Sequence, residues 1–484
     1  MGENQVQYEE TNGPESPLWK LFLVSSIAAG MQFGWALQLS LLTPYVRLLG
    51  IPHQWSSIIW LCGPMYGMVV QLIVGFMSDR LVSRFGRRKP FIVTGTTLIC
   101  LAVLLIGFAA DIGYKMGDNF NLKTKQMAVA FFVTGFRILD IAGYMVMGPA
   151  RALLADLSRH NHRKMRIANA FFSFFMAVGN ILGYTVGSYN KLYKLLPFTL
   201  TKECDTYCAN LKICLLINII ILIVLVGIAL NVVPEPHFTK NTDHEDPFVL
   251  QVKLTFRNLG RPMWLLFLVT ALNWIAWFPF LLFDTDWVGK EIYGGDPTSK
   301  DTSMGKIYDN GLRVGSLGLM LNSGVLGLMS LAIDPLSKWL GGARKLWGVV
   351  NFVLAAALAL TALVTKVAEK ARKTAPPYAP PDHGAKAGVL AIFAAMGIPL
   401  AVTFSIPFAL ASIFSSESGS GHGISQGVLN LAIVIPQIFV PLISGPWDQL
   451  FGGGNLPAFL LGAVVAFIDG ILVLTVLPPP SSNT

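Results

Sequence analysis

Residues 75–90, GFMSDRLVSRFGRRKP, form a short basic segment between two long apolar stretches of the chain. A related pattern, DPLSKWLGGARK at residues 334–345, again follows a long apolar stretch. The intervals Asp79–Gly86 and Asp334–Gly341 are equal. Because the two segments follow the second and the eighth apolar stretch, this weak repeat predicts two halves of similar construction, each with six stretches.

The composition excludes an ordinary soluble enzyme, because 53% of the 484 residues are hydrophobic, 13% are charged and the mean hydropathy is +0.58. Twelve mostly apolar stretches are each long enough to cross roughly 30 Å of hydrocarbon. Their residues do not alternate as the strands of a membrane barrel do. The sequence therefore predicts an all-α membrane protein with twelve transmembrane helices. The stretches begin near Trp19, Trp55, Pro90, Ala128, Ile167, Cys214, Pro262, Leu312, Leu346, Ala387, Ile424 and Pro457.

Basic residues are densest in two short loops, each of which follows an even-numbered stretch. Since Lys and Arg accumulate in cytoplasmic loops, we place these loops and both termini in the cytoplasm. The same rule explains the net charge of +9 better than nucleic-acid binding does. The acidic first residues are not those of a cleavable signal peptide. The two loops contain Arg80, Arg84, Arg87, Arg88 and Lys89, and Arg159, Arg163, Lys164 and Arg166.

The polar stretch around Pro234–Pro262 divides the chain into two predicted six-helix bundles, an architecture typical of alternating-access carriers. A second polar stretch, at about 366–386, is expected to be an outward loop. The predicted segments are a cytoplasmic tail at 1–18, a first bundle at 19–233, a cytoplasmic loop at 234–261, a second bundle at 262–477 and a cytoplasmic tail at 478–484.

Asp140 lies inside an apolar stretch, and unusual residues share its face of the predicted helix. A charge within a membrane span is costly, so it usually faces a water-filled path or a partner. We therefore interpret Asp140 as a carboxylate of a transport path. The alternative is a structural ion pair with Arg137, three residues away. The face, at a period of 3.6 residues, consists of Arg137, Asp140, Gly143, Tyr144, Met147 and Arg151.

The five cysteines do not form a disulfide scaffold. Cys62 and Cys100 lie within apolar stretches, where cysteine packs as a small apolar residue. Cys204, Cys208 and Cys214 lie in or beside a predicted outward loop, where one bridge among them is plausible and its pairing stays open. Clustered Ser/His/Asp residues, metal-ligand spacings and phosphate loops are absent from the sequence, so we expect no enzyme, no metal and no cofactor.

The segment Gly75–Arg88 resembles the signature loop of the major facilitator superfamily. In such a loop Asp79 can pair with basic residues and cap a neighbouring helix, which latches the cytoplasmic side when the carrier opens outward. The alternative is a plain basic cytoplasmic loop. The predicted latch consists of Asp79, Arg80, Arg87 and Arg88.

Further segments resemble plant sucrose/proton symporters, and the resemblance extends from about residue 17 to 479. It implies the twelve-span fold, a location in the plasma membrane or the vacuolar membrane, and uptake of sucrose or a related glucoside coupled to a proton. The oligomeric state stays open. The segments are Gln32–Tyr45, Leu49–His53, Trp60–Pro64, Ala168–Asn180, Trp274–Trp287, Phe404–Ser412 and Gly427–Val434.

The resemblance assigns roles to four residues. Asp140 matches the carboxylate that takes up the proton, and burial and reprotonation suit this role. Arg151 matches an arginine that holds this carboxylate ionised in one state; the alternative is snorkelling to the membrane edge. His53 matches a histidine of the first outward loop, or is a surface histidine. Arg313, near the outer end of the eighth span, is a gate residue or an interfacial anchor.

Departures from the family gather on the predicted substrate cavity. The resemblance leads us to expect an aromatic residue at Arg137, amides at Gly143 and Tyr144, and a glutamine at Met147. Amides suit sugar hydroxyls because they both donate and accept hydrogen bonds. The sequence therefore predicts a sucrose/proton symporter with an altered substrate pocket. One alternative is a carrier of a more apolar glycoside, and another is a transport-impaired, remodelled or sensor-like member of the family. The predicted cavity residues are Gln38, Tyr66, Arg137, Gly143, Tyr144 and Met147, and further departures are Met77, Leu400 and Asp469.

Overall fold

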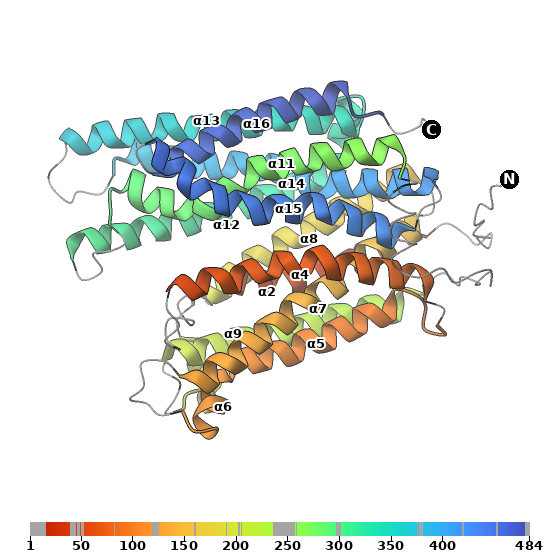
Figure 1. Cartoon of the computed structure of the whole chain (residues 1–484), viewed down its shortest axis with the longest axis horizontal. Coiled ribbons are helices and arrows are strands. Elements are labelled where there is room, and N and C mark those ends of the chain that lie inside the picture. Colours follow the sequence, from red (N-terminus) through yellow and green to blue (C-terminus); the bar gives the residue numbers. More distant parts are fainter. Residues whose placement is uncertain are drawn as a thin grey trace. The chain divides into compact units, whose positions relative to one another are not determined.

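The computed structural model describes most of the chain, and its regular elements are helices (Figure 1). Apart from one bridge between Thr201 and Cys204, the described ranges contain no strand pairing. For residues 53–62, 418, 445, 446, 448 and 449 only the backbone is described. The described residues are 16–38, 45, 49, 53–81, 83–118, 125–158, 161–189, 191–201, 204, 206–235, 257, 259–296, 302–374, 376, 381–418, 421–451 and 454–479.

Every predicted apolar stretch coincides with a long helix, except that the first forms two consecutive helices. The all-α prediction is therefore confirmed. The helices are α1 (Leu18–Ser25), α2 (Ile27–Leu37), α4 (His53–Arg80), α5 (Lys89–Gly107), α7 (Gln126–Ser158), α8 (His162–Ser188), α9 (Thr206–Val232), α11 (Arg261–Trp287), α12 (Ser303–Trp339), α13 (Ala343–Thr374), α14 (His383–Ser418), α15 (His422–Leu450) and α16 (Leu456–Thr475). Shorter elements are α6 (Ala109–Lys115), the 3-10 helices η2 (Leu192–Lys194) and η3 (Pro197–Thr199), and the π-helical turn η4 (Val288–Ile292).

Eleven helical segments of the described residues are long and apolar enough to cross a membrane. The one predicted span outside these eleven is the second, which corresponds to α4 and has 28 residues. At about 1.5 Å per residue its length is about 42 Å, more than the thickness of the hydrocarbon layer. The chain is therefore a multi-pass membrane protein.

Local sequence signals mark several helix starts. Pro90 and Pro457 lie in the first turns of α5 and α16, where a missing backbone N–H costs no helical hydrogen bond. The side chain of Asn161 caps α8 by accepting a hydrogen bond from the N–H of Lys164 at 3.0 Å.

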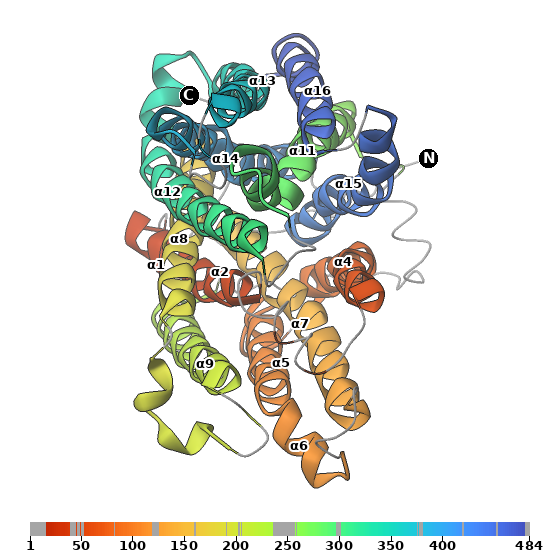
Figure 2. The same ribbon diagram turned by 90° about the vertical axis from the view of Figure 1, so that its left-hand side faces the viewer.

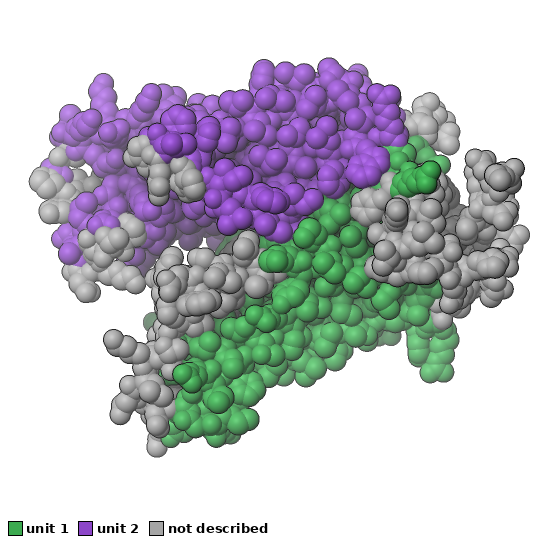
Figure 3. Space-filling model, in the orientation of Figure 1, with its two compact units in different colours: residues 1–260, 408–431 green, residues 261–407, 432–484 purple. Residues whose placement is uncertain are grey.

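The chain forms two compact units, coloured green and purple in Figure 3. Unit 1 comprises residues 1–260 and 408–431, and unit 2 comprises residues 261–407 and 432–484. The end of α14 and the start of α15 thus group with unit 1, although the sequence repeat assigns them to the second half. Their contacts with α4 and α7, described below, account for this grouping. The boundaries of the two six-helix bundles stay a prediction.

Within unit 1, α5 packs along α7, and α2 packs along α8 (Figure 2). Small residues permit this close approach. A Cβ atom added at Gly95 of α5 would lie 2.8 Å from Val146 and 3.1 Å from the carbonyl oxygen of Ala142. The helices therefore touch through their backbones, as is common for packing in membranes.

Within unit 2, α16 packs against both α13 and α11. A Cβ atom at Gly462 would lie 2.8 Å from the carbonyl oxygen of Ala276 on α11. On the other side, one at Gly470 would lie 3.2 Å from the carbonyl oxygen of Gly348 on α13. Because glycines on α16 have no side chain, this helix can pack closely against both neighbours.

The outward loop predicted at 366–386 is shorter than expected. Helix α13 extends to Thr374, and α14 begins at His383. The last turns of α13 are charged, and Arg372 there donates hydrogen bonds to the backbone carbonyls of Glu291 and Ile292. Hydropathy placed the end of this helix too early, because a helix can continue after its apolar residues end.

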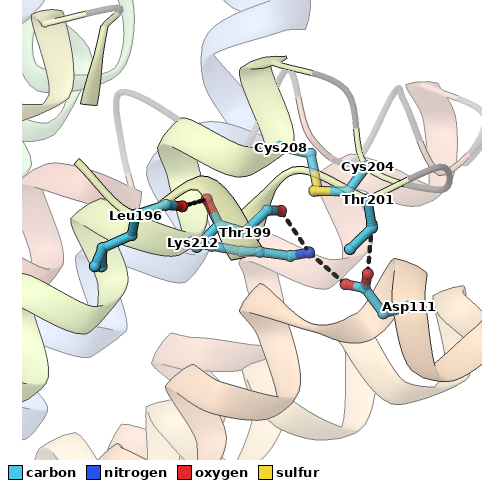
Figure 4. Close-up of a disulfide and its surroundings, with 7 residues drawn as sticks. All are labelled: Asp111, Leu196, Thr199, Thr201, Cys204, Cys208 and Lys212. Carbon is cyan, nitrogen blue, oxygen red and sulfur yellow. Dashed lines mark hydrogen bonds and ion pairs between the residues drawn. A yellow bond between two sulfur atoms is a disulfide. The ribbon is translucent and has the colours of Figure 1, made fainter. Parts of the chain in front are cut away.

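A disulfide joins Cys204 to Cys208 in the segment before and within the first turn of α9 (Figure 4). Cys214, which the sequence left as a possible partner, is a free and buried thiol. Beside the bridge, the buried Lys212 ammonium lies 2.5 Å from a carboxylate oxygen of Asp111 on α6. Bridge and ion pair together fix this segment on the ends of α6 and α9.

Candidate functional site

Asp140 lies in the middle of α7, a helix of 33 residues, and its side chain is half-buried. Its Oδ2 atom is buried and has no hydrogen-bond partner among the described residues. On α4, a Cβ atom added at Gly63 would lie 3.2 Å from this oxygen. The carboxyl group therefore faces a site that its neighbours leave without a hydrogen bond.

Arg137 does not pair with Asp140. Its side chain is exposed, and the ion pairs of the described residues do not include either of the two. The alternative prediction of a structural ion pair is thus not realised in this structure. A carboxyl group without a cation in a membrane span costs several kcal/mol when ionised, so it favours a bound proton or a polar ligand.

Tyr144, one turn after Asp140, packs into a gap that glycine provides on α4. A Cβ atom at Gly67 would overlap the Tyr144 ring. The carbonyl oxygen of Gly67 also accepts a hydrogen bond from Asn430 of α15 at 3.3 Å. In the next turn, Gln71 packs in the same way against Gly148. This row of contacts fixes the register of α4 along α7.

The other predicted cavity residues of unit 1 lie on α2, α4 and α7. Gln38 is buried at the end of α2, whereas Tyr66, Gly143 and Met147 are half-buried. At Gly143 an added Cβ atom would meet only the tip of Met31, at 3.8 Å. These residues bring few polar groups to the neighbourhood of Asp140.

Arg151 is buried on α7, three turns after Asp140. Its guanidinium lies between two aromatic rings, 4.1 Å from the ring centre of Phe172 and 3.6 Å from that of Phe408. It also donates a hydrogen bond to Asn169 at 2.9 Å. The eleven residues to Asp140 span about 16 Å of helix, which explains why the two side chains do not touch. Arg151 therefore connects α7 with α8, through Asn169 and Phe172, and with α14, through Phe408.

Asp79, at the end of α4, both pairs with an arginine and caps a helix. Its carboxylate lies 2.5 Å from the Arg88 guanidinium. It also accepts hydrogen bonds from the backbone N–H groups of Gly423 and Ile424, at 2.9 and 2.8 Å. Those groups belong to the first turn of α15, where backbone N–H groups have no helical partner and a negative charge is favoured. The two contacts that the sequence predicted for Asp79 are therefore present.

Asp156, near the end of α7, completes this cluster. Its two oxygens bind Arg87 at 2.7 Å and Arg88 at 3.0 Å. Burial lowers the pKa of Arg88, but the carboxylates of Asp156 and Asp79 outweigh this effect and raise it above its usual value. Arg80 lies outside the cluster, because its exposed side chain stacks over Phe76 at 4.2 Å.

Glu235, just after α9, holds the basic loop from the other side. One of its oxygens accepts hydrogen bonds from the backbone N–H groups of Arg87 and Arg88, at 2.9 and 2.8 Å. The other accepts one from Lys89, which begins α5. Burial raises the pKa of Glu235, and the backbone N–H groups act against this rise. Gly86 has a φ of +99°, and a Cβ atom there would overlap Glu235.

The sequence did not identify Asp156 or Glu235 as site residues. Their signals were weak: a carboxylate one turn after the conspicuous Arg151, and a glutamate between two prolines. In the following text, the latch cluster denotes Asp79, Arg87, Arg88, Asp156 and Glu235.

Two further predicted residues do not join these groups. Arg313 is exposed on α12 in unit 2. His53 is the first residue of α4, and its side chain lies outside the described part of the structure. The second copy of the repeat is also simpler than the first, because Asp334 pairs with Lys338 of its own helix at 2.8 Å. Among the described residues, no group of three or more His, Cys, Asp or Glu side chains could hold a metal ion.

Comparison with known proteins gives consistent matches over nearly the whole chain. The family model of the Major Facilitator Superfamily matches residues 68–436. The sucrose transport protein SUC4 of Arabidopsis thaliana is 49% identical over 95% of this chain and 90% of its own length. The sucrose transport protein SUT2 of Oryza sativa subsp. indica is 48% identical over 96% of this chain and 93% of its own length.

Solved structures share the fold at low sequence identity. The Major Facilitator Superfamily transporter FucP, solved in an outward conformation, has a TM-score of 0.62 and 15% identity, covering 94% of this chain and 97% of its own. The proton:xylose symporter XylE, solved with 6-bromo-6-deoxy-D-glucose, has a TM-score of 0.59 and 14% identity, covering 96% of both chains.

Proposed function

This chain belongs to the plant sucrose transport proteins of the Major Facilitator Superfamily, and we propose that it carries sucrose or a related glucoside across a membrane together with a proton. As a member of this superfamily it is a transporter and not an enzyme. The transport cycle is alternating access: the sugar site opens to one side of the membrane at a time.

The environment of Asp140 is the observation that supports the proposal of proton coupling. The buried oxygen of this side chain has no hydrogen-bond partner among the described residues, and Arg137 does not neutralise it. Such a carboxyl group favours a bound proton, and the protonated group can donate a hydrogen bond to an oxygen of the sugar. Proton and sugar are thereby bound together at one carboxyl group, so each favours binding of the other, which is the minimal requirement for symport.

The pocket favours a sugar with an apolar portion. Among the predicted cavity residues, the hydroxyls of Tyr66 and Tyr144 and the amide of Gln38 can bind sugar hydroxyls, whereas Gly143 and Met147 bring none of the amide groups that the family pattern has there. A site that lacks hydrogen-bond partners discriminates less strongly for a polar ligand. A more apolar glycoside is therefore the second candidate substrate.

Binding to the purified protein distinguishes the two substrates. We expect both sucrose and an aryl glucoside to bind, and Met147→Gln to strengthen sucrose binding relative to the aryl glucoside. Met127→Gln is the matched control, because Met127 lies on the same helix but is exposed near its start, 20 residues before Met147. If neither sugar binds the unmodified chain, the transport proposal fails and the sensor-like alternative gains support.

The latch cluster supports a gate. It joins the ends of α4 and α7 to the starts of α5 and α15, so the start of α15 can leave α4 only when Asp79 releases two N–H groups. We place this cluster on the cytoplasmic side, where it holds the carrier closed while the opposite side is open. The plasma membrane is the proposed location, with the vacuolar membrane as the alternative and both termini in the cytoplasm.

A further inference from the structure

A fully buried polar network crosses the interior of unit 2. It centres on Asp469 of α16, whose exposed fraction is 0%. The Asp469 Oδ2 atom accepts a hydrogen bond from Asn351 of α13 at 2.7 Å and another from Asn273 of α11 at 3.3 Å. The two amides also bond to each other at 2.7 Å. One carboxyl group and two amides thus join three helices.

The network continues to a fourth helix. Thr403 of α14 donates its hydroxyl to the carbonyl oxygen of Asn273 at 3.0 Å. The same hydroxyl oxygen accepts a hydrogen bond from the indole N–H of Trp277 at 3.2 Å. All of these side chains are fully buried. Apart from one carboxyl oxygen, every polar atom named here therefore has a partner.

That remaining atom is Asp469 Oδ1, which is buried and has no hydrogen-bond partner among the described residues. Asp469 is the only charged residue of α16. The charged groups on the helices that carry the network all lie at least six residues from Asn273, Asn351 or Thr403, about 9 Å along a helix, and none forms an ion pair with Asp469. They are Arg261, Asp284 and Asp286 of α11, Arg344, Lys345, Lys366, Glu369, Lys370, Arg372 and Lys373 of α13, and His383, Lys386 and Glu417 of α14.

Close helix packing keeps water away from this carboxyl group. Gly470, the next residue, lies against the Gly348 backbone of α13 and the Phe352 ring. A Cβ atom at Gly348 would in turn overlap Leu474, one turn further along α16. An ionised carboxyl group at this position would have two amide donors, no cation and no solvent.

We propose that Asp469 is a proton-binding site that stays occupied: the residue is a neutral carboxylic acid with its proton on Oδ1. A buried group of this kind usually neutralises rather than keeping an uncompensated charge. The neutral acid leaves only one O–H group without an acceptor, whereas the ionised form leaves a whole charge uncompensated. Oδ2 then serves as a neutral acceptor for both amides.

This proton differs in role from the one proposed for Asp140. The Asp140 side chain is half-buried, so a proton can reach it, whereas Asp469 is fully enclosed by α11, α13 and α14. The proton on Asp469 is therefore retained through the transport cycle. Its role is to let the carboxyl group bind two amides without a buried charge.

Infrared spectroscopy tests the proposal on the purified full-length chain. The difference between the unmodified chain and Asp469→Asn at neutral pH should show the loss of one carboxylic-acid C=O band. Asp334→Asn is the matched control, because that carboxylate is paired with Lys338 and should lose ionised-carboxylate bands instead. Loss of only ionised-carboxylate bands in Asp469→Asn would overturn the proposal.

Retention of the proton has a separate readout. The acid band should keep its intensity when sucrose or Na⁺ is added and across the pH range in which sugar uptake changes. Since Asn imitates the neutral acid, Asp469→Asn should also transport with an unchanged pH profile. A band that weakens on adding sugar or Na⁺, or a shifted uptake profile, would contradict retention.

If Asp469→Asn does not fold, a second variant tests the proposal. The double variant Asp140→Asn/Asp284→Asn removes two other span aspartates that have no ion pair. A carboxylic-acid C=O band should remain in its spectrum, and the absence of any such band would refute the proposal. These spectra do not depend on sugar transport, so failure of the proposed function and failure of this inference are distinguishable.

Discussion

Asp79→Asn is the most informative perturbation of the latch cluster, because it keeps the shape of the side chain and removes its charge. The carboxylate makes three close contacts: with the Arg88 guanidinium at 2.5 Å, and with the N–H groups of Gly423 and Ile424 at 2.9 and 2.8 Å. An amide offers one oxygen in place of two. Its NH₂ group therefore faces either an N–H group of α15 or the guanidinium, and neither can accept a hydrogen bond.

The magnitude follows from these contacts. Loss of a helix cap costs about 1 kcal/mol. Breaking a buried ion pair costs about 3–5 kcal/mol when the remaining charge has no partner. Because Arg88 keeps its ion pair with Asp156, the cost here is smaller than that. We expect a total of about 2–3 kcal/mol, which changes the equilibrium between the attached and detached α15 start by about 30- to 150-fold.

Thiol labelling of Ser425→Cys measures this equilibrium in detergent-solubilised protein. Ser425 lies in the first turn of α15, is 2% exposed and contacts the Ser415 hydroxyl at 3.0 Å, so labelling requires detachment. Asp79→Asn should accelerate labelling by the factor above. In the control Asp334→Asn, a partly exposed i,i+4 pair with Lys338 is lost, worth about 0.3–0.5 kcal/mol, and the rate should change about twofold or less. Equal rates in both variants would refute the reasoning.

Two further variants test other parts of the account. Arg137→Trp should leave the pH profile of sugar uptake unchanged, because Arg137 is exposed and does not pair with Asp140; a shifted profile would show that its charge reaches that carboxyl group. Gly86→Ala should lower the free energy of unfolding by about 2–4 kcal/mol, since it combines an unfavourable positive φ with displacement of the Glu235 cap. Gly342→Ala, at a φ of +129° with open space for a Cβ atom, has only the backbone penalty of about 1–2 kcal/mol, so equal losses would refute the role of Glu235.

The fold was predictable because a membrane span depends mainly on the length of an apolar stretch. The same dependence explains the error at the end of α13, where charged residues up to Thr374 continue the helix. The short repeat has a structural counterpart, because Gly86 and Gly341 both adopt a positive φ. The equal spacing from an aspartate, which predicted two halves of similar construction, thus ends at a glycine of positive φ in both segments.

The candidate site was predictable only along one helix. Helical periodicity placed Arg137, Asp140 and Arg151 on one stretch of α7, but their surroundings differ, from an exposed guanidinium to one enclosed by two rings. Which neighbours a side chain meets depends on α4, α8 and α14, and periodicity has no information about them. For the same reason the cap formed by Glu235, 148 residues from Arg87, had only a weak signal in the sequence, a glutamate between two prolines.

The central claim is that Asp140 couples the movement of sugar to that of a proton. Sucrose uptake into proteoliposomes, with and without an imposed inward proton gradient, tests it directly for the unmodified chain and for Asp140→Asn. We predict that the gradient drives accumulation in the unmodified chain, whereas Asp140→Asn still exchanges sucrose down its own gradient but does not accumulate it. Gradient-driven accumulation by Asp140→Asn would contradict the account.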